Sequence, residues 1–358
     1  MDEKMFVPAS TVVSCCAPYG GGGLGQHLTQ LVEDARVQGI LSHYYASAIR
    51  DGDAAGRIVD VRLTSWLNSY TPARFSPGWK NHLGNELWDR AVAARLEPAH
   101  TFTGFVGQAL KSFQRARQLR YQNLELQAAN SHVNNVARRH TVAISRFGIE
   151  TSWLNEAQHR KTLREYDAAD AIYVASEYTR QSFLAEGVTP SKLYKRTLDV
   201  QSRFKAPHLP PTDDVFRVVY CGSLTVMKGI PVLIEAFSRL SGGRVELILV
   251  GGWATRGMRR YLQSWLQRDA RIHIAPGDPL PYLQRADVYV HPSFNDGFAY
   301  APMEALAVGV PVIVTEDTGM KEHVREGVNG YVVPTGDWEA ILERLEFLRQ
   351  ARLVVEAS

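Results

Sequence analysis

Short apolar runs alternate with amphipathic stretches along this sequence, and this alternation constrains the fold more than any other feature. The pattern is clearest in the second half, where runs such as Phe216–Cys221, Val245–Val250 and Val288–His291 are each followed by a glycine or polar loop and a helical pattern. Runs that are apolar on both sides indicate buried parallel strands, and helices between them must cover both faces of the sheet. The sequence therefore predicts an α/β fold, in which ligands bind beyond the carboxyl ends of the strands.

The first half shows the same pattern at its two ends. Residues 10–17 are predicted to form a buried strand, followed by the glycine run Gly20–Gly23 and a helix that stops at Gly39. Residues 170–175 form a second predicted strand, and Ser176 is placed as the N-cap of the helix after it. Residues 40–100 give no clear pattern. Residues 102–120 predict an amphipathic helix with a basic side, which suits either a core face or a helix lying on a membrane.

The length and one polar segment divide the chain. A chain of 358 residues exceeds what a single hydrophobic core usually supports. Residues 206–214 are rich in proline and polar side chains, as linkers often are. We therefore expect a Rossmann-like N-terminal domain over residues 1–205, a linker over 206–214 and a second Rossmann-like domain over 215–358.

The charge distribution and the cysteine content narrow the partners and the cellular compartment that we expect for this chain. Residues 1–205 hold 25 Lys and Arg against 19 Asp and Glu, whereas the rest holds 15 against 18. A basic front half suits an anionic acceptor or weak peripheral contact with a membrane, although a solvated surface explains it equally well. The three cysteines show no metal or disulfide spacing, and no apolar run approaches the roughly 18 residues of a membrane span. No secretory signal is recognised, so we expect a cytoplasmic protein, at most at the inner face of the membrane.

The segment from His291 to Glu304 carries the clearest signs of a ligand site. A strand ends at His291, Asp296 and Gly297 form a tight turn, and a helix is predicted to start near Pro302. A helix N-terminus directs free N–H groups at the space above the sheet, which favours a phosphate. Carboxylates at Asp296 and Glu304 could accept hydrogen bonds from sugar hydroxyls, but a helix cap and a solvated acid would have the same spacing.

Two further glycine loops are weaker signals. The loop Gly222–Gly229 contains Lys228, which could reach a diphosphate, and a surface loop explains it as well. Gly20–Gly25 lacks a convincing dinucleotide-binding register, because no acidic residue ends a second strand about twenty residues further on.

The order of these segments resembles family 4 (group 1) of the retaining glycosyltransferases, which have the GT-B fold. The resemblance is strong over residues 165–337 and thin over 40–130. It rests mainly on the following residues: Gly222, Leu224, Lys228, Gly229, Pro292, Ser293, Asp296, Gly297, Phe298, Glu304, Ala305, Ala307, Gly309, Pro311, Val312 and Ile313. The resemblance implies two Rossmann-like domains whose parallel sheets face each other across a cleft.

The resemblance also implies roles for single residues. Lys228 would neutralise a donor diphosphate, Glu304 would bind ribose hydroxyls, and Asp296 would hold the transferred sugar together with the backbone of residues 297–300. The donor-binding residues that it implies are Gly22, Gly23, Ser223, Lys228, Asp296, Gly297, Phe298, Ala299, Tyr300 and Glu304. His132 resembles a histidine near the reacting sugar, and is predicted as catalytic with Asp296 and Lys228. A satisfied structural histidine is the alternative.

The implied reaction is retaining transfer of a sugar from a donor such as a UDP-, GDP- or ADP-sugar to a hydroxyl of a glycan, lipid-linked or small-molecule acceptor. No metal, other cofactor or nucleic acid is expected. Two departures weaken the resemblance: Ser223 stands where the family usually has arginine, and Asp296 where it usually has glutamate. They leave open a non-catalytic carbohydrate- or nucleotide-binding protein. A sugar-nucleotide epimerase or a phosphorylase of the same fold is also open.

Overall fold

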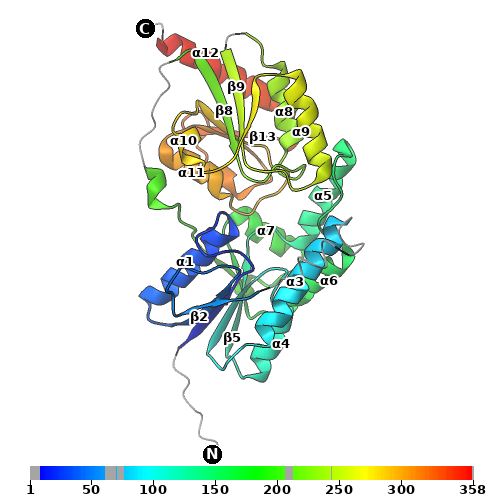
Figure 1. The fold of residues 1–358 in the computed structure, drawn as a ribbon, viewed down its shortest axis with the longest axis vertical. Coiled ribbons are helices and arrows are strands. Elements are labelled where there is room, and N and C mark those ends of the chain that lie inside the picture. Colours follow the sequence, from blue (N-terminus) through cyan, green and yellow to red (C-terminus); the bar gives the residue numbers. More distant parts are fainter. Residues whose placement is uncertain (1–8, 61–69, 71–75, 206–212, 243, 357–358) are drawn as a thin grey trace, which may run out of the picture. The chain divides into compact units, whose positions relative to one another are not determined.

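The computed structural model describes residues 9–60, 70, 76–205, 213–242 and 244–356 (Figure 1). The chain forms two compact units with interleaved boundaries. Unit 1 contains residues 1–137 and 151–198, and unit 2 contains residues 138–150 and 199–358. Most of the predicted linker, residues 206–212, lies outside the described residues.

Unit 1 contains a parallel sheet of seven strands in the order β3-β2-β1-β4-β5-β6-β7. This is a doubly wound order, in which the chain reverses its direction of winding between β1 and β4. The strands are β1 (Thr11–Ser14), β2 (Leu41–Ala46), β3 (Gly56–Ile58), β4 (Thr101–Phe105), β5 (Asn123–Ala128), β6 (Ala171–Val174) and β7 (Leu193–Lys195). Among the described residues, the α-helices that start in this unit include α1 (Leu24–Val37), α3 (Pro77–Ala93), α4 (Leu110–Gln118), α5 (Val133–Phe147), α6 (Glu156–Ala168) and α7 (Glu177–Ala185).

Unit 2 contains a parallel sheet of six strands with the same winding, β10-β9-β8-β11-β12-β13. Its reversal point lies between β8 and β11. The strands are β8 (Val215–Cys221), β9 (Arg244–Val250), β10 (Ile272–Ala275), β11 (Val288–His291), β12 (Val312–Thr315) and β13 (Gly330–Val333). The α-helices are α8 (Ile230–Arg239), α9 (Arg256–Arg268), α10 (Leu280–Leu283), α11 (Tyr300–Val308) and α12 (Trp338–Glu356).

Apolar side chains cover both faces of each sheet, as the strand pattern predicts. All seven residues of β8 are buried. Phe216, Val218 and Tyr220 belong to one core with residues of α8, and Val219 and Cys221 belong to another core with residues of α11. In unit 1, Phe102 packs with Trp88 and Phe113, whereas Val13 packs on the opposite face with Leu28 of α1. The α/β fold with parallel sheets is therefore confirmed.

The helix predicted over residues 102–120 is wrong. Residues 101–105 form the strand β4, whose five residues are all buried, and helix α4 starts only at Leu110. Phe102 and Phe105 contact opposite faces of the sheet, as side chains three positions apart in a strand must. Within residues 102–120, only the part that forms α4 is an amphipathic helix. Its apolar residues Leu110, Phe113 and Ala116 are buried in unit 1, so its apolar side is a core face.

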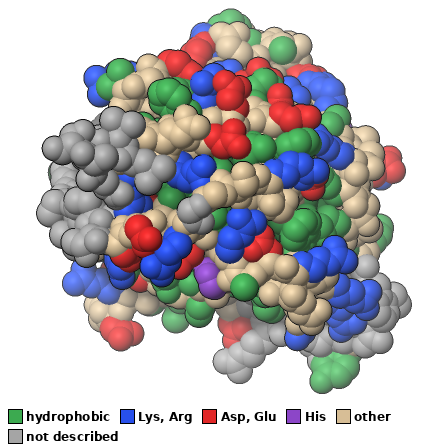
Figure 2. All heavy atoms as spheres, turned by 90° about the horizontal axis from the view of Figure 1, so that it is seen from above, with side chains coloured by type: hydrophobic (Ala, Val, Ile, Leu, Met, Phe, Trp, Pro, Cys, Tyr) green, Lys and Arg blue, Asp and Glu red, His purple; other side chains and the backbone are tan. Residues whose placement is uncertain are grey.

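The described residues form no membrane-spanning helix, and charges of both signs are mixed on the surface that Figure 2 shows. No helix among the described residues is long and apolar enough to cross a bilayer. On the face drawn in Figure 2, Lys and Arg side chains are intermixed with Asp and Glu side chains. Within the same described ranges, no group of three or more His, Cys, Asp or Glu is arranged to hold a metal ion.

Candidate functional site

The loops after β8 and β11 meet at the reversal point of the unit 2 sheet. Phe294 donates its backbone N–H to the carbonyl of Met227 at 2.8 Å, and the Ser293 hydroxyl donates to the same carbonyl at 3.2 Å. A Cβ at Gly229 would lie 1.9 Å from the carbonyl oxygen of Pro292, so only glycine allows this approach. The glycine after Lys228 thus brings the two loops together.

Lys228, His291 and Asp296 form a connected polar group between these loops. Lys228 Nζ forms an ion pair with Asp296 Oδ2, and His291 Nε2 lies 3.2 Å from the same oxygen. An ionised carboxylate only accepts hydrogen bonds, so Nε2 of His291 carries the proton. Nδ1 of His291 is buried and has no hydrogen-bond partner among the described residues. Two of the predicted site residues, Lys228 and Asp296, are therefore brought into direct contact.

The environment fixes the charge state of this group. Burial alone would raise the pKa of Asp296, but the positive charge of Lys228 and the hydrogen bond from His291 outweigh it and hold that pKa below its ordinary value. Burial lowers the pKa of His291 against the opposing effect of Asp296, and the charge of Lys228 lowers it further. Near pH 7 Asp296 is therefore a carboxylate and His291 a neutral imidazole.

Helix α11 begins directly after the Asp296 turn. It starts at Tyr300, so Pro302 is its third residue rather than its first as predicted. Ala299 precedes it with φ 54°, a left-handed backbone that is unusual for any residue except glycine, and no side chain of the described residues caps this end. An uncapped first turn leaves N–H groups available to an anion.

Tyr300 and Glu304 are held within this helix. The Tyr300 hydroxyl is buried without a hydrogen-bond partner among the described residues, and burial raises its pKa. Glu304 is the fifth residue of α11 and is buried. Its negative charge contributes to the raised pKa of Cys221 at the end of β8, although burial is the larger cause. Glu304 therefore lies close to the carboxyl end of that strand.

Ser223, which is predicted to bind the donor, is exposed and carries no positive charge.

Sequence reasoning missed two residues that support the Lys228 loop and the Asp296 turn through contacts distant in the chain. Glu150, far upstream, accepts a hydrogen bond from the Val226 backbone N–H at 2.6 Å, and its other oxygen accepts from Thr255. Arg139 forms an ion pair with Asp317, whose carbonyl accepts the Asp296 N–H at 3.3 Å. No local sequence signal marks Glu150 or Arg139, because both act through contacts distant in sequence.

The predicted glycines Gly22 and Gly23 lie in unit 1, in the loop between β1 and α1. Both are exposed, and Gly23 has φ 58° as the residue before α1. A Cβ at either position would meet no atom within 4 Å, so no neighbour in the described structure requires glycine there. Gly25 is different, because its Cβ would lie 2.4 Å from the carbonyl of Pro18. The role of Gly22 and Gly23 at a diphosphate stays a prediction.

His132 is buried in unit 1. Its ring lies 4.8 Å from the ring of Tyr166 and 5.1 Å from that of Phe183, and its Nδ1 accepts the backbone N–H of Asn134 at 3.2 Å. These contacts describe a structural histidine that caps the start of α5. Its catalytic role stays a prediction.

Comparison with known proteins identifies the same region. Residues 201–352 match the family model described as "Glycosyl transferases group 1". The chain is 32% identical over 141 residues to the capsular polysaccharide biosynthesis glycosyltransferase CapM of Staphylococcus aureus. This match covers 38% of this chain and 37% of CapM. The chain spans less than half the length of the first relatives that it matches.

Solved structures match over nearly the whole chain at low identity. HepE of Anabaena, in complex with UDP and glucose, gives a TM-score of 0.66 at 15% identity, over 95% of this chain and 89% of that one. WaaG, a glycosyltransferase involved in lipopolysaccharide biosynthesis, gives a TM-score of 0.66 at 16% identity, over 95% of this chain and 90% of WaaG. The two sheets, the reversal-point loops and the family match agree: residues 201–352, which make up most of unit 2, match the glycosyl transferase group 1 family, and the chain has a GT-B-like α/β fold.

Proposed function

We propose that this chain transfers a sugar from a nucleotide-diphosphate donor to a hydroxyl of an acceptor, with the donor bound by unit 2. The observation that carries the proposal is the Lys228–Asp296 pair, held at the reversal point of the sheet beside the uncapped start of α11. A cation, a helix N-terminus and a carboxylate at one point suit a ligand that joins a diphosphate to a sugar. HepE, whose structure was solved with UDP and glucose, has a similar fold.

In this proposal the site residues act on the leaving group and the sugar. Lys228, which is one third exposed, exchanges Asp296 for diphosphate oxygens when the donor binds. The released Asp296 accepts hydrogen bonds from the transferred sugar, as does Glu304 from the ribose. Stabilising the departing diphosphate with the cation and helix N–H groups lowers the barrier without a protein nucleophile. We therefore propose transfer with retention, in which Lys228 and the helix end supply the positive charge that a metal ion would otherwise supply.

The relatives support a role in glycan synthesis. CapM carries the name of a capsular polysaccharide enzyme and WaaG is described as an enzyme of lipopolysaccharide biosynthesis. We propose that the acceptor of this chain is likewise part of a growing glycan or glycolipid.

The test separates donor binding from turnover. The full chain is screened by thermal shift with UDP, GDP and ADP and their sugars, and a ligand at ~100 times its dissociation constant adds about 2.7 kcal/mol. Turnover is then measured with the donor that binds. Lys228→Ala and Glu304→Gln are expected to lower turnover by about 10²-fold. The exposed Arg268→Ala and Glu343→Ala are the matched controls. Near-normal turnover in both site variants would overturn the proposal.

A non-catalytic nucleotide-binding protein is the second candidate. Ser223 favours it, because the exposed start of the Lys228 loop carries no second cation. Nucleotide binding that Lys228→Ala weakens, without donor turnover against a panel of saccharide acceptors, would select this candidate.

A further inference from the structure

Two donors of different kinds hold the same oxygen of Asp296. Lys228 Nζ and His291 Nε2 both contact Oδ2, but 31% of the Lys228 side chain is exposed and only 4% of the His291 side chain. Lys228 lies in the loop after β8 and carries its charge on a flexible four-carbon stem, so it can turn to another anion. His291 is buried at the end of β11 and has no such freedom.

The strand and two aromatic rings fix the His291 imidazole. His291 is the last residue of β11 and pairs with Val314 of the neighbouring strand β12. The ring centroids of Tyr220 and Tyr289 both lie 6.4 Å from that of the imidazole, and the ring planes lie within 8° and 17° of its plane. Both tyrosine side chains are fully buried. The direction of the Nε2–H bond is therefore set by the core of unit 2 and not by the loops.

Neither of these tyrosines supplies a hydrogen bond to Asp296 in place of His291. A tyrosine hydroxyl carries one proton. Tyr220 and Tyr289 donate theirs to backbone carbonyls at and after the end of β8, at 3.0 and 3.2 Å. Among the described residues, His291 is the neutral side chain that hydrogen-bonds the carboxylate of Asp296.

The backbone of Asp296 is fixed as well. Its N–H donates to the carbonyl of Asp317 at 3.3 Å, and its carbonyl accepts from the N–H of Gly319 at 3.0 Å. With both backbone groups held and Oδ2 held by His291, the carboxylate keeps one orientation. Within the described chain no residue donates a hydrogen bond to Oδ1, so this oxygen is left for a hydroxyl of a ligand.

The hydrogen bond from His291 matters most once Lys228 has left Asp296. A buried carboxylate without a partner takes up a proton, because burial disfavours its charged form. Burial raises the pKa of Asp296, whereas the charge of Lys228 and the hydrogen bond from His291 lower it. A hydrogen bond to a charged group changes an equilibrium by about 10- to 100-fold. With His291 in place, Asp296 therefore stays ionised after Lys228 has turned away.

We propose that His291 is the positioning residue of this site: its neutral Nε2–H keeps Asp296 ionised and oriented while Lys228 turns to the diphosphate of the donor. This role rests on the proposed function in one step, which is the exchange of Lys228 between Asp296 and the diphosphate. His291 acts through Asp296 and not on the sugar itself. Without His291, each nucleotide that draws Lys228 away leaves a buried carboxylate that must take up a proton.

Other ionisable groups lie around Asp296, and they stay the same in the His291 variants. Besides Lys228, the elements packed around it carry Tyr220 of β8, Glu304 of α11 and Asp317 of the turn after β12. Burial raises the pKa of Tyr220, which keeps its hydroxyl neutral, and Asp317 is paired with Arg139. A difference in proton uptake between wild type and a His291 variant therefore reports on Asp296.

Calorimetric titration of the full chain with UDP measures both the affinity and the protons taken up on binding. Titrations at pH 6.5, 7.5 and 8.5, each in two buffers that differ in ionisation enthalpy, give the two quantities. At pH 6.5, His291→Leu should take up about half a proton or more beyond wild type, because its Asp296 protonates. At pH 8.5, where that proton is scarce, its affinity for UDP should be about 10-fold or more below that of wild type.

Two further variants control for the loss of the imidazole. His291→Gln keeps an N–H at the same distance along the side chain as Nε2, so its UDP affinity and proton uptake should lie within about 2-fold of wild type. His273→Leu removes an exposed histidine from β10 of the same unit and should change neither quantity. Proton uptake and UDP affinity in His291→Leu that equal those of wild type would overturn the proposal.

A double variant shows whether His291 acts through the carboxylate. In His291→Leu combined with Asp296→Asn, the amide cannot take up the proton. The extra uptake should vanish, and the UDP affinity should return to that of Asp296→Asn alone. Restored binding also shows that the leucine is tolerated in the fold. An affinity loss that persists in the double variant is a purely structural effect of the leucine and contradicts the proposed role.

Turnover keeps this role distinct from the proposed function. If wild type turns over no donor but His291→Leu still takes up the extra proton with UDP, the proposed transfer fails alone. If Lys228→Ala weakens UDP binding while His291→Leu behaves as wild type, the positioning role of His291 fails alone.

Discussion

Lys228 is ion-paired with Asp296, 68 residues later in the chain, so the cation assigned to the diphosphate is bonded to the carboxylate assigned to the sugar. The pair neutralises two charges that would otherwise be unpaired in a half-buried site. In the proposed function, a donor diphosphate therefore competes with Asp296 for Lys228.

Asp296→Asn is expected to separate binding from turnover. The amide removes the charge that holds Lys228, so nucleotide affinity should stay the same or rise. Turnover should fall by about 10²-fold, because the sugar loses a charged acceptor. Calorimetric titration with UDP and steady-state kinetics measure the two effects. A loss of UDP binding equal to the loss of turnover would contradict this assignment of roles.

Ser223→Arg is expected to strengthen nucleotide binding. Ser223 is exposed and only its backbone carbonyl is used, by the Tyr220 hydroxyl at 3.0 Å, so a long side chain fits without loss. A guanidinium beside a diphosphate should improve UDP affinity by about 3- to 10-fold, and the gain should shrink at high salt. Ser223→Gln controls for side-chain length. An arginine variant that binds no better than the glutamine variant would show that the diphosphate lies away from this residue.

Gly229→Ala is expected to destabilise unit 2 more than an ordinary glycine substitution. Gly229 has φ 72°, and the added Cβ would overlap the carbonyl of Pro292, which implies a cost of about 3 kcal/mol or more. Gly148 has a similar φ of 62° but open space around its Cβ position, so Gly148→Ala should cost only about 1–2 kcal/mol. Urea unfolding of both variants isolates the contribution of the loop contact. Equal losses would mean that the two loops do not need this approach.

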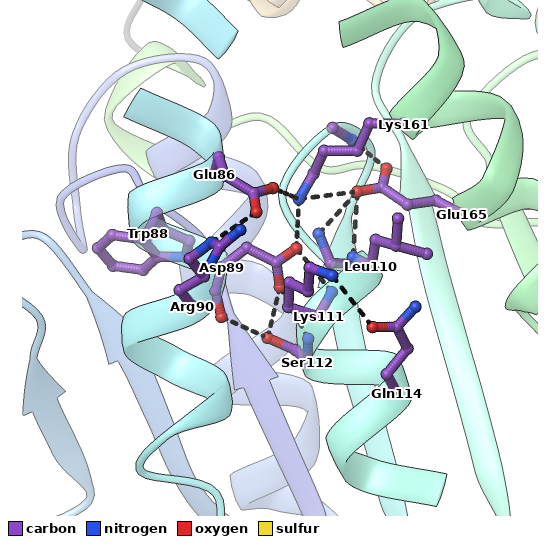
Figure 3. Close-up of polar contacts among 12 residues, drawn as sticks. Glu86, Trp88, Asp89, Arg90, Leu110, Lys111, Ser112, Gln114, Lys161 and Glu165 are labelled. Atoms are coloured by element: carbon purple, nitrogen blue, oxygen red, sulfur yellow. Dashed lines mark hydrogen bonds and ion pairs between the residues drawn. The ribbon is translucent and has the colours of Figure 1, made fainter. Parts of the chain in front are cut away.

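Lys161→Met is expected to cost about 3–5 kcal/mol of the free energy of unfolding, because it leaves Asp89 and Glu165 buried without their cation (Figure 3). Both carboxylates also accept hydrogen bonds from backbone N–H groups of residues 107–112. The neighbouring Arg160→Met removes only an exposed pair with Glu156 and should change stability by about 0.5 kcal/mol or less. Denaturant unfolding of the two variants is the measurement. A Lys161 variant as stable as the Arg160 variant would show that the backbone N–H groups alone satisfy both carboxylates.

Glu165 should make stability depend on pH in a particular direction. Burial raises the pKa of Glu165 to about 7, although Lys161 and the backbone N–H groups act against it. A carboxyl group whose pKa is raised on folding stabilises the folded protein. This stabilisation is complete below the pKa of the unfolded state, near 4.5, and is lost as the pH rises through the folded-state pKa of about 7. The stability of wild type relative to Glu165→Gln should therefore fall by about 3 kcal/mol from pH 4.5 to above pH 7. Urea midpoints of both proteins at pH 5, 6, 7 and 8 provide the check, and a constant or rising difference would contradict the prediction.

The prediction from sequence succeeded where the signal is local. The strand and helix around Ser176 were predicted correctly, since Ser176 accepts the Thr179 N–H as an N-cap does. It failed over residues 102–120, where a strand and a helix were joined into one helix. The side chains that cap α4, Asp89 and Glu165, come from α3 and α6, so no cap signal exists near its own start.

Periodicity, glycine positions and motif order determined the α/β class, the parallel sheets and the loops on which the candidate site lies, because each depends on residues close together in sequence. Only the tertiary structure decided that Lys228 and Asp296 are paired, that Glu150 and Arg139 join unit 2, and that Asp89 and Glu165 cap α4 from other helices. Ion pairs and such caps depend on which elements the fold places side by side, and residues far apart in the chain carry no local mark of that placement.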